Sequence, residues 1–319
     1  MTLTELRYIV AVSQTHHFGK AAEMCNISQP SLSVAVKKLE KELGLMLFER
    51  RTIDIVPTPV GERIIRQAKI VLAEAERIHE IAQVDRDPLS GTLRLGVIYT
   101  ISPYLLPELV RRSIARTPQM PLQISEDYTV NLLNKLRNGQ IDAAILALPL
   151  TESGLMACDL YDEDFIVVVP KNHKLAKESS ITPKQLAKEK MLILAQGNCF
   201  RDQVLGVCPE TMRIGSDGTN SVSHTLEGSS LATIRHMVAS SLGISVFPAS
   251  ARNYDVGDSL VSYVDFENPV PNRRIAIVWR KSFPRTEAIM EIVKSCGQVR
   301  LEGIHHLEPN PRTLELTNK

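Results

Sequence analysis

Residues 18–50 read FGKAAEMCNISQPSLSVAVKKLEKELGLMLFER and predict a helix, a tight turn and a second helix. Ser28 is a favourable N-cap for the second helix, and Pro30 suits its first turn. Apolar residues at mostly four-residue spacing then continue that helix as far as Gly44, a residue type that commonly ends helices. Because an apolar stripe over residues 3–12 adds a helix before this pair, we expect a helix-turn-helix unit.

The residues that follow predict a wing. Residues 46–51 and 53–56 have the pattern of two short strands around a basic turn. Strands placed directly after a helix-turn-helix are typical of a winged helix. We therefore expect a winged helix-turn-helix DNA-binding domain over residues 1–58.

A long helix is expected next, because Thr58 can cap it and Pro59 can begin it. Its apolar residues recur at steps of four and three, which is the a/d pattern of a coiled coil. These residues are Ile64, Ala68, Val71, Ala75, Ile78 and Ala82. A helix packed on its own domain could show the same stripe. We favour a dimerisation linker over residues 59–87, because the helix is long and a break follows at residues 87–91.

From Gly91 onward apolar strands alternate with helices, which predicts an α/β fold with mainly parallel sheets covered by helices on both faces. We expect the region 91–302 to form two lobes. Lobe I would comprise about 91–162 and 269–302, and lobe II about 163–268. Ligands in such folds bind between the lobes at the carboxyl ends of strands. The tail, residues 303–319, contains Pro309 and Pro311 and is expected to be loosely ordered.

Composition narrows the class of protein and its compartment. The 319 residues are 44% hydrophobic, and no apolar run approaches the roughly 18 to 20 residues that span a bilayer. The N-terminal residues do not resemble a signal peptide, so we expect a cytoplasmic protein without membrane contact. The net charge is +1, so an argument for DNA binding depends on where charges lie rather than on their sum. An odd count of five cysteines without a CxxC pair argues against a disulfide framework and a zinc site, and no cofactor is expected.

The second helix of a helix-turn-helix enters the major groove with its N-terminal residues near base edges. Gln29 can pair with adenine, and serine hydroxyls suit bases or phosphates. Basic side chains on this helix and in the wing would neutralise phosphates. The candidate DNA-binding residues are Ser28, Gln29, Pro30, Ser31, Ser33, Lys37, Lys38, Arg50 and Arg51. Pro30 has an equally strong structural explanation as a residue of the first turn.

This region resembles the N-terminal domain of LysR-type transcriptional regulators. The shared motifs are FGKAAE (18–23), SQPSLS (28–33), KLE (38–40), LG (43–44), LFER (47–50) and TPVG (58–61). The resemblance implies a dimerising linker helix and a two-lobed effector domain similar to periplasmic binding proteins. It also implies double-stranded promoter DNA, RNA polymerase and further copies of this chain, as a homodimer or homotetramer, for partners.

A second informative stretch, residues 197–208, reads GNCFRDQVLGVC. Cys199 follows a polar turn, precedes Arg201 and lies where a helix is expected to begin. A thiol at a helix N-terminus beside a cation ionises more easily, and the thiolate is the form that attacks peroxide. The other cysteines outside this stretch, Cys25, Cys158 and Cys296, are expected to be structural.

The stretch also resembles the OxyR branch of the LysR family, which contains the hydrogen peroxide-sensing regulators. The pattern CxRDQxxGxC (199–208) carries the resemblance, and PYLLP (103–107) and ILAL (145–148) support it. It implies that Cys199 is the peroxidatic cysteine and Cys208 the resolving one, with reduction by cellular thiols. It further implies a peroxide pocket, formed by Thr100, Thr129, Asn198 and Asp202. Asn198 departs from the histidine usual in the branch, because an amide cannot carry a proton charge near neutral pH.

The implied disulfide conflicts with a helix over the same residues. Nine residues of helix span about 13 Å at 1.5 Å per residue, whereas a disulfide needs Cα atoms within roughly 7 Å. If the reduced stretch is helical, oxidation must therefore remodel it.

Two alternatives remain open at this point. A LysR-type regulator could bind a small organic effector between its lobes, near Thr100, Thr129 and residues 199–203. A thiol peroxidase is the alternative from the enzyme class, although a catalyst has no use for a winged helix.

Overall fold

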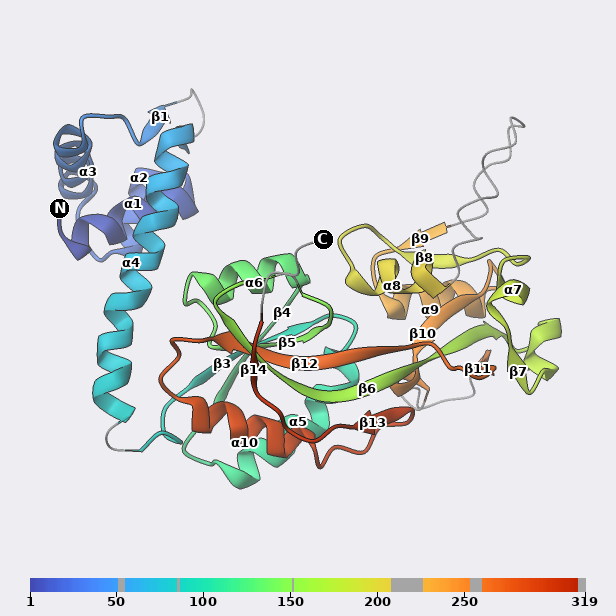
Figure 1. Ribbon diagram of the computed structural model, residues 1–319. Helices are drawn as coiled ribbons and strands as arrows, with labels where there is room; N and C mark the ends of the chain where they lie inside the picture. The colour runs from blue at the N-terminus through green and yellow to red at the C-terminus, as the bar shows by residue number, and fades with distance from the viewer. Residues whose placement is uncertain (51–54, 85–86, 151, 208–225, 253–259, 315–319) are drawn as a thin grey trace. The chain divides into compact units, whose positions relative to one another are not determined.

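The computed structural model describes residues 1–50, 55–84, 87–150, 152–207, 226–252 and 260–314 (Figure 1). The chain forms two compact units, one built from Met1–Asp87 and the other mainly from the residues after Pro88. Each unit has its own hydrophobic core. Within the described residues, no helix combines the length and the apolarity that crossing a bilayer requires.

The first unit confirms the predicted winged helix-turn-helix. Its elements are α1 (Leu3–Thr15), α2 (Phe18–Met24), α3 (Gln29–Leu43), β1 (Phe48–Arg50), β2 (Ile55–Pro57) and α4 (Pro59–Val84). The Ser28 side chain accepts a hydrogen bond from the Ser31 backbone N–H, and Gly44 ends α3 with φ at 69°, as the sequence predicts. The antiparallel pair β1 and β2 forms the wing.

Helix α4 packs into the core of this unit along only part of its length. Ile65 and Ala68, in its first turns, are buried in the core with α1. Further along, Val71 is 37% and Ile78 69% exposed. The predicted a/d stripe is therefore divided, because Ala68 is turned into the core while Val71 and Ile78 face solvent.

Lobe I of the second unit is a mixed sheet in the order β4-β3-β5-β12-β6. Strands β3 (Leu93–Ile98), β4 (Leu122–Asp127) and β5 (Ala143–Ala147) are parallel, and β12 (Asn272–Arg280) lies antiparallel between β5 and β6 (Leu155–Pro170). Helices α5 (Ser102–Arg116) and α10 (Thr286–Cys296) cover one face and α6 (Thr129–Arg137) the other (Figure 1). The returning strand β12 is the reason that the sheet is mixed rather than mainly parallel.

Strand β6 is long enough to belong to both lobes. Its residues 155–164 pair with β12, and residues 165–170 pair with β10 (Ser245–Pro248) and β11 (Val261–Phe266) of lobe II. The change of partners falls at Asp164 and Phe165, and β12 begins beside it at Asn272. Lobe II also contains β7 (Ser180–Ile181), α7 (Pro183–Leu186), β8 (Leu192–Leu194), α8 (Cys199–Val207), β9 (Leu226–Gly228), α9 (Leu231–Ala239) and two 3-10 turns (Lys174–Lys177 and Ala249–Ala251).

The expectation of a loosely ordered tail from residue 303 is wrong for the part that the structure describes. Strands β13 (Ile304–His306) and β14 (Arg312–Thr313) pair with the edge of β6 that β12 leaves open. Ile304 and Leu314 pack against the lobe I core. An open strand edge presents unpaired backbone groups, and the tail satisfies them despite its prolines.

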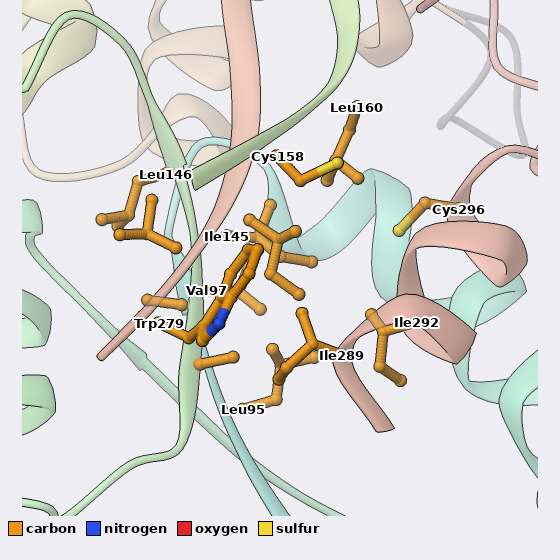
Figure 2. Packing of buried hydrophobic residues seen from close by; sticks show 14 of the residues in the cluster. Leu95, Val97, Ile145, Leu146, Cys158, Leu160, Trp279, Ile289, Ile292 and Cys296 are labelled. Atoms are coloured by element: carbon orange, nitrogen blue, oxygen red, sulfur yellow. The ribbon is translucent and has the colours of Figure 1, made fainter. Parts of the chain in front are cut away.

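Figure 2 shows the centre of the lobe I core around Trp279 of β12, the only tryptophan of the chain. The indole is 2% exposed and lies among side chains of β3, β5 and α10. Cys158 and Cys296 lie in the same core. Lobe I therefore offers a rigid, dry platform for the loops at the carboxyl ends of its strands.

Candidate functional site

Cys199 is the first residue of α8 and follows a tight turn after β8. Gly197 within this turn has φ at 95°, a conformation that favours glycine because it lacks a Cβ. The turn is followed by Asn198, which is only 6% exposed, and by the half-buried Cys199. Local backbone geometry thus brings the thiol to the lobe surface rather than into the lobe interior.

A very small cavity lies against this turn. Its volume is about 10 Å³, which is room for the centre of about one water molecule. Three chain segments line it, namely residues 98–100, 127–129 and 197–199. The first two segments follow the neighbouring parallel strands β3 and β4, so the cavity lies at the carboxyl ends of strands, where ligands of such folds bind.

Two predicted threonines line this cavity, and their hydroxyls differ in their surroundings. Thr100 is 3% exposed, and its Oγ1 accepts a hydrogen bond of 2.8 Å from Arg273 Nη1. The Oγ1 of Thr129 is buried and has no hydrogen-bond partner within the described residues. A buried hydroxyl without a partner is unfavourable by about 1–3 kcal/mol. Thr129 is therefore suited to a small polar molecule in the cavity.

Asn198, another residue of the predicted peroxide pocket, also lines the cavity. Its Nδ2 donates to the carbonyl oxygen of Ala195 at 3.2 Å, which fixes the amide within the turn. The side chain therefore helps to shape the turn before Cys199. As an amide it remains uncharged near neutral pH.

Asp202 is the predicted pocket residue that does not line the cavity. It belongs to the first turn of α8 and is exposed. Three residues of helix carry it about 4.5 Å along the axis from Cys199, onto the solvent face. Cys208 lies outside the described residues, which end in this region at Val207.

The sequence analysis did not single out Arg273, a buried residue at the start of β12. The Nε of Arg273 donates to Glu163 Oε2 at 2.7 Å, and Nη2 donates to the Thr100 carbonyl oxygen at 3.0 Å. Glu163 also accepts from the Ser250 hydroxyl. The relevant signal was the pair Arg273-Arg274 at the start of an apolar strand, because alternate residues of a strand point to opposite faces.

Consecutive residues of α8 pack into different lobes. Cys199 packs against the lobe I core, whereas Phe200 is buried in the lobe II core. The Phe200 ring lies edge-on to Phe165 with centroids 5.1 Å apart, and the guanidinium of Arg273 lies 4.8 Å from its centroid. The start of α8 is thereby held to both lobes.

Two further side chains hold α8 in place. Arg201 donates from Nη1 to the Leu194 carbonyl oxygen at 2.8 Å and forms an ion pair of 2.6 Å with Glu227. Its charge, expected to assist Cys199, is thus balanced by Glu227. Gln203 Nε2 donates to the Leu148 carbonyl oxygen at 3.3 Å, which links α8 to lobe I.

Cys158 and Cys296 have the surroundings of structural cysteines. Both are buried in the lobe I core, and burial raises the pKa of each thiol, that of Cys296 to about 12. A nearby charge on Cys158 would raise the Cys296 value further. Burial also raises the pKa of Cys25, which is half-buried in the first unit.

The candidate DNA-binding side chains of α3 are available to a partner. Ser28, Gln29, Pro30 and Ser31 are exposed, as are Lys37 and Lys38, and Ser33 is half-buried. Lys38 is engaged with Glu5 of α1 at 3.2 Å, and this contact lowers the pKa of Glu5. Arg50 belongs to β1, and Arg51 lies outside the described residues.

Comparison with known families now decides the class of protein. The model named "Bacterial regulatory helix-turn-helix protein, lysR family" matches residues 3–62, and "LysR substrate binding domain" matches residues 86–299. The chain belongs to the LysR family of transcriptional regulators. This membership confirms the winged helix-turn-helix, the two-lobed α/β domain and the prediction of a regulator rather than a thiol peroxidase.

Similarity to individual proteins places the chain in the OxyR branch of the LysR family. It is 34% identical to the "DNA-binding transcriptional dual regulator OxyR" of Escherichia coli K12, covering 95% of this chain and 97% of that protein. It is 38% identical to a "Probable hydrogen peroxide-inducible genes activator" of Streptomyces viridosporus, and the match covers 91% of this chain and 92% of that protein. The solved structure of a full-length OxyR variant from Pseudomonas aeruginosa is 45% identical in sequence and superposes with a TM-score of 0.77. The match covers 97% of this chain and 99% of that chain.

A further similar structure contains hydrogen peroxide. It is a cysteine variant of OxyR from Corynebacterium glutamicum, described as hydrogen peroxide-bound. It is 35% identical, covers 93% of this chain and 92% of that protein, and has a TM-score of 0.62. Among the described residues, no group of three or more His, Cys, Asp or Glu could hold a metal ion.

The burial differences predict selective alkylation. In the folded, reduced protein at pH 8, iodoacetamide should modify Cys199 well before Cys158 and Cys296. The reason is that both core thiols are inaccessible, and at this pH the Cys296 thiol is far below its pKa of about 12 and stays protonated. Peptide mass mapping over time measures the order, and unfolding in guanidinium should make all three react. Modification of Cys296 as fast as Cys199 in folded protein would contradict the burial.

Proposed function

We propose that this chain senses hydrogen peroxide through Cys199, closes a reversible Cys199–Cys208 disulfide, and so controls the transcription of oxidative-stress genes. The observation that carries the proposal is the water-sized cavity at Cys199, lined by Thr100, Asn198 and the unpartnered hydroxyl of Thr129. Hydrogen peroxide is a small molecule that both donates and accepts hydrogen bonds. It therefore suits the polar lining of this cavity and is far smaller than an organic effector.

The cavity volume favours peroxide over the alternative of an organic effector. Pockets for small organic ligands enclose roughly 300–1,000 Å³. The space beside Cys199 is about 10 Å³. An organic acid at Thr100 and Thr129 would have to separate the two lobes there, and this would break the packing of Cys199 on the lobe I core.

The sensing chemistry proceeds through a sulfenic acid. The thiolate of Cys199 attacks one peroxide oxygen, the O–O bond breaks, and hydroxide leaves as water after taking up a proton. The sulfenic acid then condenses with the Cys208 thiol and releases a second water. Cytosolic dithiol reductants return the disulfide to two thiols.

Formation of this disulfide requires α8 to unwind. Regular helix from Cys199 to Val207 spans about 12 Å along its axis, and one more residue changes a Cα distance by at most about 3.8 Å. A disulfide needs Cα atoms within about 7 Å. Unwinding would withdraw Cys199 from lobe I and release Gln203 from Leu148, so oxidation would change how lobe II is held.

The chain acts on promoter DNA as an oligomer in this proposal. Val71 and Ile78 lie seven residues apart on α4, so both face the same side of the helix and form an exposed apolar stripe. A second copy of α4 would cover this stripe and so form a homodimer. Two such dimers would form the homotetramer. The cytosolic regulator would then bind DNA through its winged helices, and the DNA-bound regulator would contact RNA polymerase.

The decisive test is a titration of reduced full-length protein with hydrogen peroxide, followed by thiol mass mapping. Wild type should form a 199–208 disulfide at low peroxide excess, and Cys199→Ser should form none. Thr129→Val should slow Cys199 oxidation roughly 10- to 100-fold, because one hydrogen bond to a charged group contributes about 1.5–3 kcal/mol.

Thr129→Ser, which keeps the hydroxyl, is the matched control and should react at nearly the wild-type rate. If dilute peroxide left both thiols of the wild type free, the sensing proposal would be wrong.

The DNA-binding assignments predict two different kinds of loss. The test uses an operator that the wild-type protein has selected from random DNA duplexes. On this operator, Gln29→Ala should weaken the binding free energy by about 1–3 kcal/mol and relax the base preference at one base pair. Lys37→Ala should weaken specific and nonspecific binding together and reduce the salt slope by about one. Fluorescence anisotropy over a salt series distinguishes them. Equal effects of both variants on specificity would argue against this division of roles.

The proposed dimer predicts that Ile78→Asp disrupts self-association, because it places a charge within the apolar stripe of α4. Sedimentation velocity should show more monomer for this variant than for Leu260→Asp, a control at a 66% exposed leucine of the second unit. A dimer unaffected by Ile78→Asp would remove α4 from the interface.

A further inference from the structure

The cavity beside Cys199 has two tyrosines in its wall as well as two threonines. Tyr99 precedes Thr100 after β3, and Tyr128 precedes Thr129 after β4. Strands β3 and β4 are parallel neighbours in which Ile98 pairs with Asp127. The register therefore brings the two Tyr-Thr pairs to the same edge of the sheet.

The tyrosine rings pack on each other in the wall of this cavity. Their centroids are 5.3 Å apart with an interplanar angle of 74°, an edge-to-face arrangement. Tyr99 is 44% exposed, whereas Thr100 beside it is 3% exposed. An edge-to-face aromatic pair contributes about 0.5–1.5 kcal/mol beyond its buried area, so the two rings form a stable rim.

We propose that Tyr99 and Tyr128 are specificity-determining residues, which admit hydrogen peroxide to Cys199 and exclude hydroperoxides that carry a bulky organic group. The inference rests on the proposed peroxide-sensing function and specifies the substrate class of the same site. It goes further by assigning selectivity to two side chains that do not take part in the chemistry.

The chemistry explains why a rim can select. With a hydroperoxide ROOH, the thiolate sulfur bonds to the terminal oxygen, the O–O bond breaks, and RO⁻ leaves and takes up a proton to become the alcohol. The sulfur is oxidised by two electrons and the peroxide is reduced by two. The R group is attached to the leaving oxygen, so it must fit beyond the reacting atoms at the moment of transfer. A cavity of about 10 Å³ with two rings in its wall is too small to hold R.

The experiment compares two oxidants on reduced full-length protein. Rate constants for Cys199 oxidation by hydrogen peroxide and by cumene hydroperoxide are measured by quenched flow with mass mapping. In Tyr99→Ala and, independently, Tyr128→Ala, the ratio of the cumene hydroperoxide rate to the hydrogen peroxide rate should rise roughly tenfold or more, about 1.4 kcal/mol of activation free energy. Tyr99→Phe retains the ring and should leave the ratio within about twofold of wild type.

The outcomes separate the two proposals. If wild-type Cys199 reacts with hydrogen peroxide but neither alanine variant changes the ratio, the tyrosines do not set selectivity and this inference is overturned, while the sensing function stands. If wild-type Cys199 reacts with neither oxidant, the proposed function itself fails. Tyr99 is partly exposed, so its alanine variant should fold, and a cooperative unfolding transition followed by Trp279 fluorescence verifies this for each variant.

Discussion

The buried ion pair between Glu163 and Arg273 is the interaction on which the sensing region depends. Glu163 lies in β6 just before that strand passes from one lobe to the other, and Arg273 lies at the start of β12 beside it. Both side chains are removed from solvent, with exposures of 1% and 0%. Removing one partner of such a pair leaves an uncompensated charge and costs about 3–5 kcal/mol. The lobes are therefore constrained at the point where they meet.

The same pair organises the groups around Cys199. Arg273 donates to both the hydroxyl and the carbonyl oxygen of Thr100, and its guanidinium lies over the ring of Phe200. One arginine thus fixes a wall of the small cavity and the residue that follows Cys199. These contacts are buried, so the start of α8 is closely packed against the strands that cross between the lobes.

Helix α8 is strongly anchored, and the proposed disulfide would require it to change. Arg201 holds it to β8 and β9 of lobe II, and Gln203 holds it to lobe I. The reduced state is stabilised by these contacts, and a bond from Cys199 to Cys208 is incompatible with the intact helix. In the proposed mechanism, the free energy released by oxidation would act against a defined set of hydrogen bonds, and such a switch would have two discrete states.

The sequence by itself determined the features that depend on local chemistry. The cap at Ser28, the stop at Gly44 and the apolar spacing of α3 are signals between near neighbours, and they predicted the winged helix-turn-helix correctly. Motif spacing likewise indicated the family and singled out Cys199.

Tertiary structure alone decided the features that depend on distant partners. The tail was expected to be loose, yet it pairs with β6, because an open strand edge is not visible from residues 303–314 themselves. Asp202 and Thr129 were both placed in the pocket, but only Thr129 lines it, since Asp202 lies further along α8 and is exposed to solvent. Arg273 and Glu163 are 110 residues apart along the chain, so no local pattern could pair them. Contacts of this kind are fixed by strand register and burial, which exist only once the sheet has formed.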